Sequence, residues 1–196
     1  MIQAASLSPT RSTPLAQMRS ADASLLVQIA GIVGFALLAA LGAQVRIYLW
    51  EVPITLQTAA VYGAGLFLGG RNGALAMLGY LLMGLFLPVF AGAESGMTYL
   101  VGAASTGYLL SYPLVAFLIG RMTSADASLG RLLGASALGA LLLFTSGVTW
   151  LHFAAGHTTW AESIYKGFVL FITWDLCKVA LVAGGYAGLN RLTNRG

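Results

Sequence analysis

Long runs of apolar residues alternate with short polar segments along most of the chain. Six of these runs come close to the roughly 20 apolar residues that an α-helix needs to cross a bilayer. They cover residues 25–48, 53–70, 73–90, 97–120, 131–154 and 166–190. The pattern therefore predicts an all-α integral membrane protein, with six transmembrane helices in a single domain that covers residues 23–196.

Two segments depart from this pattern. Residues 1–22 are rich in Ser, Thr, Pro and Gln and have no continuous apolar stretch, so we expect a disordered tail rather than a signal peptide. Ser111 and Pro113 interrupt the fourth run, and a kink or a re-entrant start is expected there.

Basic residues are unevenly distributed between the two sides of the predicted bundle. If both termini lie in the cytoplasm, only Arg46 and Lys166 fall on the outer side, together with Glu51, Glu94 and Glu162. Short cytoplasmic loops carry an excess of Lys and Arg, so the distribution predicts N-in, C-in topology with a cytoplasmic tail at the N-terminus. The arginines of the inner side are Arg11, Arg19, Arg71, Arg121, Arg131, Arg191 and Arg195.

Composition supports the membrane assignment and excludes several classes of protein. The chain of 196 residues is 58% hydrophobic and only 8% charged, whereas soluble domains carry about 25% charged residues. Its net charge of +4 comes from scattered residues, so no binding of nucleic acid is expected. The single cysteine, Cys177, excludes an intramolecular disulfide and a multi-cysteine metal site.

Motifs for catalysis and nucleotide binding are absent from the sequence. No P-loop, GxSxG or HExxH motif occurs, and no pair of intramembrane aspartates marks a protease. His152 and His157 are five residues apart, beyond the spacing that places two ligands on one helical face, so a surface or loop role is favoured for them. We therefore expect a protein that is not an enzyme and has no cofactor or metal.

Two charged residues, Asp175 and Lys178, lie inside the last apolar run. A charge at the centre of a bilayer costs about 2.5–3.5 kcal/mol on insertion scales. Because the two residues are three positions apart, they share one helical face and can neutralise each other. One interpretation is a buried ion pair that fixes the last helix to its neighbours. The other, which we favour because buried ion pairs are often no more stabilising than apolar packing, is a polar ligand site: the carboxylate accepts N–H donors and the ammonium binds a carboxylate or carbonyl.

Two further stretches carry polar groups on the predicted outer side. In VPITLQT (52–58), Gln57 either hydrogen-bonds a ligand or satisfies a neighbouring helix. Between residues 87 and 117, Pro88 and several glycines break the apolar pattern, and irregular backbone at membrane depth needs protein or a water-filled cavity around it. This favours a loop that caps a site, with side chains such as Tyr108 available for contacts, over an ordinary flexible loop.

Alanines recur at four-residue spacing in the first run, as the pairs Ala36–Ala40 and Ala39–Ala43. Small residues at this spacing let helices approach closely. The pairs either pack within the bundle or form a docking surface for another membrane subunit.

Taken together, these stretches resemble the BioY family, the biotin-specific substrate-binding (S) components of energy-coupling factor (ECF) transporters. They occur in the order typical of the family and cover nearly the whole hydrophobic region, so the resemblance is more specific than any single motif. The similar segments are VPITLQT (52–58), AGLFLGGRNGAL (64–75), GYLLMGLFLPVFAG (79–92), GYLLSYPLVAFLIG (107–120) and WDLCKVALVAG (174–184).

The resemblance implies a six-helix S component in a bacterial cytoplasmic membrane, with a biotin pocket open to the outside. It maps the biotin-contacting aspartate and lysine of the last helix onto Asp175 and Lys178, and a loop that covers the ligand onto roughly residues 91–106. The alanine pairs of the first run correspond to the family's docking motif for the membrane scaffold (T) subunit. Two cytoplasmic ATPase subunits complete the implied assembly.

The sequence also departs from the family in the covering loop. Some relatives have a ligand-contacting asparagine after the Phe-Ala of PVFA, where this chain has Gly92. A neighbour such as Glu94 or Ser95 is then expected to supply that contact. GAASTGYL (102–109) replaces the GPTGGYL of relatives, which predicts a less tightly turned loop.

Because the chain has no nucleotide site, the energy for accumulation has to come from elsewhere. One alternative to an ATPase module is a standalone carrier, as a single chain or as a homo-oligomer. Another is a proton-coupled secondary transporter for biotin or a similar small vitamin, with Asp175 as the proton site. An intramembrane enzyme and a structural assembly subunit are the remaining alternatives.

Overall fold

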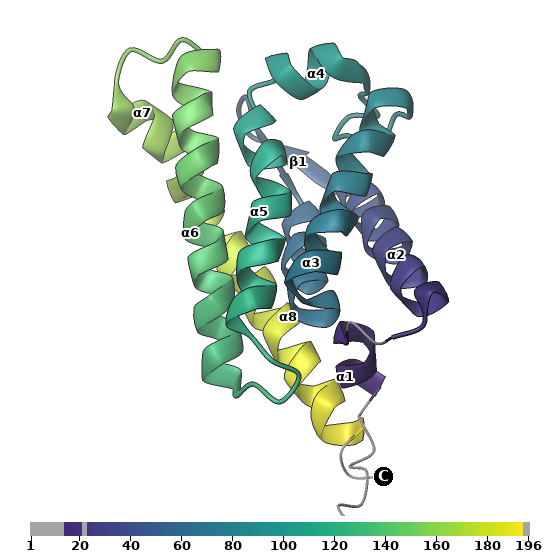
Figure 1. Ribbon diagram of the computed structural model, residues 1–196. Coiled ribbons are helices and arrows are strands. Elements are labelled where there is room, and N and C mark those ends of the chain that lie inside the picture. Colours follow the sequence, from purple (N-terminus) through teal and green to yellow (C-terminus); the bar gives the residue numbers. More distant parts are fainter. Residues whose placement is uncertain (1–13, 21–22, 194–196) are drawn as a thin grey trace, which may run out of the picture.

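Helices make up most of the described chain (Figure 1). The computed structural model describes residues 14–20 and 23–193. In chain order the elements are α1 (Pro14–Arg19), α2 (Leu25–Gln44), β1 (Arg46–Tyr48), β2 (Pro53–Thr55), α3 (Gln57–Phe86), α4 (Gly96–Gly102), α5 (Thr106–Met122), α6 (Leu129–Ala154), α7 (Trp160–Ile164), the π-helical turn η1 (Tyr165–Val169) and α8 (Leu170–Thr193). The two strands pair antiparallel as a short hairpin.

Helix α3 contains both the second and the third predicted spans and folds back on itself between them. At Gly69 the backbone has φ 76° and ψ 178°, a conformation open to glycine but costly for other residues. Gln57 and Tyr80 are hydrogen-bonded, although in a straight helix residues 23 positions apart would lie about 34 Å from each other. The two halves of α3 therefore run antiparallel, with the turn at Gly69.

The structure does not confirm the predicted count of six spans. Within the described residues, four helices are long and apolar enough to cross a membrane, namely α2, α3, α6 and the continuous stretch Trp160–Thr193. The pair α4 and α5 makes a fifth if it is counted as one broken span. The count falls below six because the fold-back at Gly69 joins two predicted spans in one element.

The fourth predicted span is broken, but not where its sequence indicates. Helices α4 and α5 meet at an angle of 88° across residues 103–105. Ser111 and Pro113 lie inside α5, where the Ser111 hydroxyl donates to the carbonyl of Tyr108. The break therefore precedes Pro113 by about two turns of α5, which begins at Thr106, and α4 ends at Gly102 directly before it.

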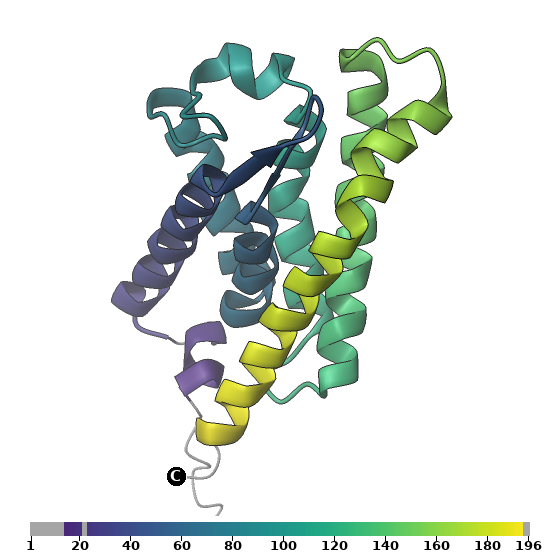
Figure 2. The same cartoon turned by 180° about the vertical axis from the view of Figure 1, so that it is seen from behind.

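The opposite ends of the bundle have different structures (Figures 1 and 2). The β1–β2 hairpin, α4 and α7 lie at one end, which we call the hairpin end; α1 and the end of α8 lie at the other, the C-terminal end. At the C-terminal end the Arg19 guanidinium donates to the carbonyl oxygens of Leu66 and Thr123. These bonds explain why part of the predicted disordered tail is helical; the rest of that tail, with Arg11, and also Arg195 lie outside the described residues.

Large apolar side chains cover much of the outer surface of the bundle. Soluble monomers rarely expose apolar patches of more than a few hundred Å², whereas a multi-pass membrane protein presents such side chains to lipid. Those more than 70% exposed are Leu25, Leu26, Phe86, Phe153, Leu181 and Leu192.

Candidate ligand-binding cavity

A cavity lies inside the bundle, below the β1–β2 hairpin, and a water-sized sphere can occupy about 40 Å³ of it. Its apolar walls come from α5, α6 and α8, and a loop and α4 contribute Ala91 and Tyr99. Its polar lining residues are Thr55, Gln57, Thr58, Tyr99, Ser105, Tyr108, Tyr112, Asp175 and Lys178. Small-molecule pockets likewise combine polar groups that orient the ligand with apolar and aromatic walls.

Asp175 and Lys178 are both buried and both line the cavity, at 1% and 9% exposure. The Lys178 ammonium lies 3.5 Å from Oδ1 of Asp175, so the two charges form an ion pair along one face of α8. The spacing of the two residues predicted this shared face. The pair places a carboxylate acceptor next to an ammonium donor at the wall of a cavity.

Thr58 joins the two charged groups. Its hydroxyl accepts from Lys178 Nζ at 2.8 Å and donates to Asp175 Oδ1 at 2.9 Å. The other carboxylate oxygen, Oδ2, accepts from the Tyr62 hydroxyl at 2.6 Å. Thr58 and Tyr62 are four residues apart on α3, so the i, i+4 relation would have identified Tyr62 once Thr58 was placed in the site.

Gln57 and Tyr108 line the cavity, but their polar atoms are engaged within the protein. The Gln57 carbonyl oxygen accepts from Thr55 at 2.9 Å, and its amide nitrogen donates to Tyr80. The Tyr108 hydroxyl donates to the carbonyl of Gly167 in η1 at 2.7 Å. Of the two roles predicted for Gln57, satisfying neighbouring groups is the one it has here, and ligand contact stays a prediction.

Three predicted ligand contacts lie outside the cavity lining. Gly92 is in a turn, closed by the hydrogen bond from Phe90 N–H to the Glu94 carbonyl, and has φ 91°. Glu94 and Ser95 follow it on the exposed side of the turn. The turn directs Ala91 to the cavity and the next residues away from it. The covering segment thus reaches the cavity through Ala91, Tyr99 and Ser105, which the motif comparison did not single out.

The four alanines of α2 lie inside the bundle. Ala36, Ala39, Ala40 and Ala43 are at most 8% exposed. Ala36 faces Gly79 of α3, where the small residues allow close approach. This placement corresponds to the packing interpretation of the two pairs, and it leaves little of their surface for another subunit.

The arrangement favours a ligand that combines hydrogen-bond donors with an apolar body. A carboxylate whose oxygens are held by Thr58 and Tyr62 accepts N–H groups, and the neighbouring ammonium donates to a carbonyl or carboxylate. Aromatic side chains such as Phe144 and Phe171 bury apolar ligand atoms. A cyclic urea or amide with an aliphatic part has this combination of groups.

Comparison with known proteins gives a consistent picture. Residues 13–195 match the BioY family. The biotin transporter BioY of Thermotoga maritima is 37% identical over 150 residues, covering 76% of this chain and 87% of that protein. The probable biotin transporter BioY of Lysinibacillus sphaericus is 36% identical over 151 residues, covering 73% of this chain and 76% of the relative.

One solved structure has the same fold. It is the crystal structure of the S-component for biotin from an ECF-type ABC transporter, with a TM-score of 0.75 over 87% of this chain and 93% of that chain. The two sequences are 23% identical, so the likeness establishes the fold and leaves the chemistry of the cavity to its own residues.

Proposed function

Because the chain belongs to the BioY family, we propose that it binds biotin in this cavity and serves as the S component of an ECF-type biotin transporter. The observation that carries the proposal is the buried pair Asp175 and Lys178, held by Thr58 at the cavity wall. An integral membrane protein retains such charges chiefly where they serve a substrate or ion pathway.

The chemistry of biotin is complementary to the residues that line the cavity. Its ureido ring has two N–H donors and a carbonyl, and Asp175 accepts an N–H while Lys178 donates to the carbonyl or to the valerate carboxylate. Phe144, Phe171 and Leu143 then enclose the thiophane ring and the aliphatic chain. Burial of a mostly apolar ligand against a few fixed polar groups is the usual basis of affinity in such pockets.

We infer six membrane crossings with both termini in the cytoplasm of a bacterial cell. The fold-back of α3 supports this count, since its two halves run in opposite directions on either side of Gly69. Arg19 and Arg121 both contact the turn region of α3 at the C-terminal end. Arginines at this end, and Glu51 at the other, agree with the positive-inside rule.

An external source of energy follows from the S-component role. We propose that a membrane scaffold subunit and two ATPase subunits reorient this chain so that biotin is released inward. A standalone or homo-oligomeric carrier and a proton-coupled carrier remain the alternatives. Biotin uptake by cells that lack the ATPase subunits, abolished by an uncoupler, would favour the proton-coupled carrier.

Equilibrium binding tests the function directly. Detergent-purified protein is expected to bind labelled biotin saturably, with about one site per chain, because the cavity has one acceptor–donor pair. Excess unlabelled biotin should displace the label. If the folded wild-type protein binds no biotin, the proposed function is wrong.

Tyr62→Phe is expected to weaken biotin binding by at least about 10-fold, because a hydrogen bond to a charged group contributes about 1.5–3 kcal/mol and about 1.4 kcal/mol is tenfold in Kd. The change removes the hydroxyl that donates to Asp175 Oδ2 and leaves the ring in place. The measurement is the Kd for labelled biotin. Tyr186→Phe is the matched control, since its buried hydroxyl bonds the Ala125 carbonyl at the C-terminal end; equal effects of the two variants would contradict the role of Tyr62.

A further inference from the structure

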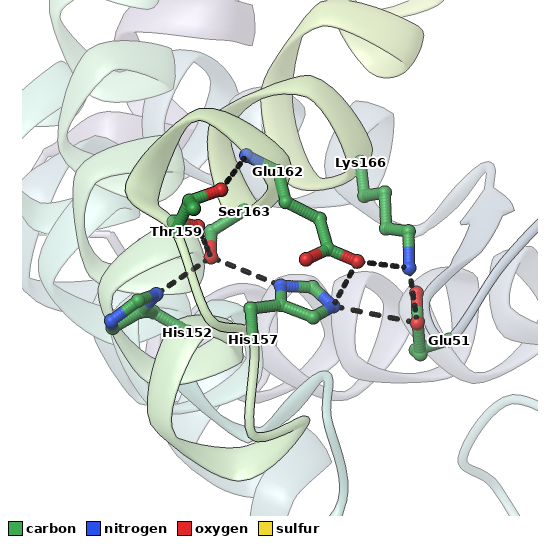
Figure 3. A network of polar contacts seen from close by, with 7 residues as sticks. All are labelled: Glu51, His152, His157, Thr159, Glu162, Ser163 and Lys166. Atoms are coloured by element: carbon green, nitrogen blue, oxygen red, sulfur yellow. Dashed lines mark hydrogen bonds and ion pairs between the residues drawn. The ribbon is translucent and has the colours of Figure 1, made fainter.

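Polar side chains from three separate segments meet at the hairpin end of the molecule (Figure 3). Glu51 comes from the turn between β1 and β2, His157 follows α6, Glu162 belongs to α7 and Lys166 to η1. We call these four residues the rim cluster. None of them lines the cavity, so the proposed binding site does not account for them.

The rim cluster forms a ring of alternating charges. Lys166 Nζ lies 2.8 Å from Oε1 of Glu51 and 2.9 Å from Oε1 of Glu162. His157 Nε2 faces the same two oxygen atoms, at 3.4 Å from Glu51 and 3.9 Å from Glu162. Two carboxylates and one ammonium leave a net charge of −1 while His157 is neutral, and protonation of His157 balances it.

The second ring nitrogen of His157 also has a partner that suits the protonated form. Its Nδ1 lies 3.0 Å from the hydroxyl oxygen of Ser163, and Nδ1 of His152 lies 2.9 Å from the same oxygen. A hydroxyl donates only one hydrogen, so Ser163 donates to at most one of the two histidines and accepts from at least one of them. When His157 is protonated, it donates to Ser163 and to Glu51, and the Ser163 hydrogen turns to His152 or to the Thr159 carbonyl.

The rim cluster connects two walls of the cavity. Glu51 directly precedes Val52 and Pro53, which line the cavity from the hairpin. Lys166 directly precedes Gly167, whose carbonyl accepts the hydroxyl of the lining residue Tyr108. Trp50, beside Glu51, places its ring 5.3 Å from Lys166 Nζ, which adds a cation–π contact across the same junction.

We propose that Glu51 is a positioning residue for the ligand: it holds the hairpin wall against the start of the last span, and protonation of His157 strengthens this hold. The inference rests on the proposed biotin binding and adds a pH-dependent retention of the bound ligand. Glu51 acts through Val52 and Pro53 rather than by touching the ligand. The groups that face His157 are Glu51 from the hairpin, Glu162 from α7, Lys166 from η1 and, through Ser163, His152 from α6.

The carboxylate of Glu51 stays ionised across the pH range in which histidines ordinarily change charge. The hydrogen bond from Lys166 lowers the pKa of Glu51 to about 2. Because this folded-state pKa is depressed, the contribution of Glu51 is fully present above the ordinary glutamate pKa of about 4.3 and is lost as the pH falls toward 2. Histidine side chains ordinarily change charge between about pH 5 and 8. A change in the dissociation rate of biotin within that pH range therefore reflects protonation of a histidine and not of Glu51.

The dissociation rate of labelled biotin from the purified full chain tests the proposal. In the wild type we expect dissociation to slow by about 3- to 10-fold between about pH 8 and pH 5.5. His157→Gln, which keeps a hydrogen-bonding side chain but cannot be protonated, should remove this slope. Glu51→Gln should release biotin about 10-fold faster than the wild type at the acidic end and also lose the slope.

Arg46→Gln is the matched control, since it removes an exposed charge from the same hairpin without touching the rim cluster. It should keep the wild-type pH profile. Dissociation from Glu51→Gln within about 2-fold of the wild type across this range, or an unchanged slope in His157→Gln, would overturn the proposal.

A measurement without ligand separates this proposal from the biotin assignment. Hydrogen exchange of the hairpin amides, residues 46–56, is compared between variants at one pH near 6. Glu51→Gln should exchange at least about 5-fold faster than the wild type, because the anchored hairpin opens more often, and Arg46→Gln should match the wild type. Equal exchange rates in all three proteins would refute the role of Glu51 in holding the hairpin, even if the protein bound biotin. Faster exchange in Glu51→Gln, in a protein that binds no biotin, would support that role and refute only the assignment of biotin as the ligand.

Discussion

Asp175→Asn is expected to weaken biotin binding by about 100-fold or more, because charge-assisted hydrogen bonds are roughly twice as strong as neutral ones and the change also leaves a buried cation unpaired. Asp175 is 1% exposed and accepts from Thr58 and Tyr62, so its geometry is fixed before the ligand arrives. Asparagine keeps the shape of the side chain but offers only one acceptor oxygen. The Kd for labelled biotin is the measurement, with Lys178→Ala alongside.

The matched control is Asp126→Asn, an aspartate in the turn between α5 and α6 at the C-terminal end, for which we expect an unchanged Kd. The double variant Asp175→Asn with Lys178→Met separates the two interpretations of the pair. Replacing a buried ion pair by neutral groups is often harmless to stability, so the double variant should recover thermal stability without recovering affinity. Recovery of both, or normal binding by both single variants, would contradict the assignment of this pair to the ligand.

Gly120→Ala is expected to destabilise the protein by about 3 kcal/mol, the upper range for overpacking. A Cβ at this position would lie 2.1 Å from the backbone nitrogen of Gly70 and 2.3 Å from the carbonyl carbon of Gly69. At this crossing the backbone of α5 therefore lies directly against the backbone of the α3 turn. Neither segment has a flexible side chain there that could move aside to make room for the added methyl group. The thermal midpoint in detergent should fall by roughly 6–12 °C.

Gly134→Ala is the control for this substitution. Gly134 lies in α6, and a Cβ there would meet nothing within 4 Å. Since alanine is the better helix former, we expect Gly134→Ala to be neutral or stabilising by up to about 1 kcal/mol. A midpoint for Gly120→Ala equal to that of the wild type would mean that α5 and α3 can separate at this crossing without loss of stability.

The sequence predicted an all-helical membrane fold and the shared face of Asp175 and Lys178, because both depend on regular periodicity. Apolar runs identify helices, and a spacing of three residues fixes the relation of two side chains on one helix. Both predictions concern residues that are close together in the sequence, and the structure agrees with both.

Features that depend on turns were predicted less well. The spans expected at 53–70 and 73–90 do meet at a turn, and it is the positive φ of Gly69 that reverses the chain there within one continuous element. Gly92, Glu94 and Ser95 were placed at the ligand from a motif, but the turn through Ala93, at φ 59°, carries them away from the cavity. The ligand roles of these residues stay predictions without support from their positions.

The histidines illustrate the same limit. Their five-residue spacing argues against a shared helical face, and His157 indeed lies beyond the end of α6. However, its N–H donates to the His152 carbonyl, so the chain turns back and both rings reach one serine of α7. The side chain of His157 is only 4% exposed, which a surface role would not explain.

The π-helical turn η1 sets the helical phase of the last span. In a regular α-helix, nine residues of separation would place Lys166 and Asp175 about 180° apart around the axis. A π-turn absorbs one extra residue, which lowers the accumulated rotation by up to about 100°. Lys166 can then face the hairpin while Asp175 faces the cavity. Deleting one uncharged residue within Tyr165–Val169 would keep the charge and leave the hydropathy almost unchanged, yet Lys166 and Asp175 could then no longer face the hairpin and the cavity together.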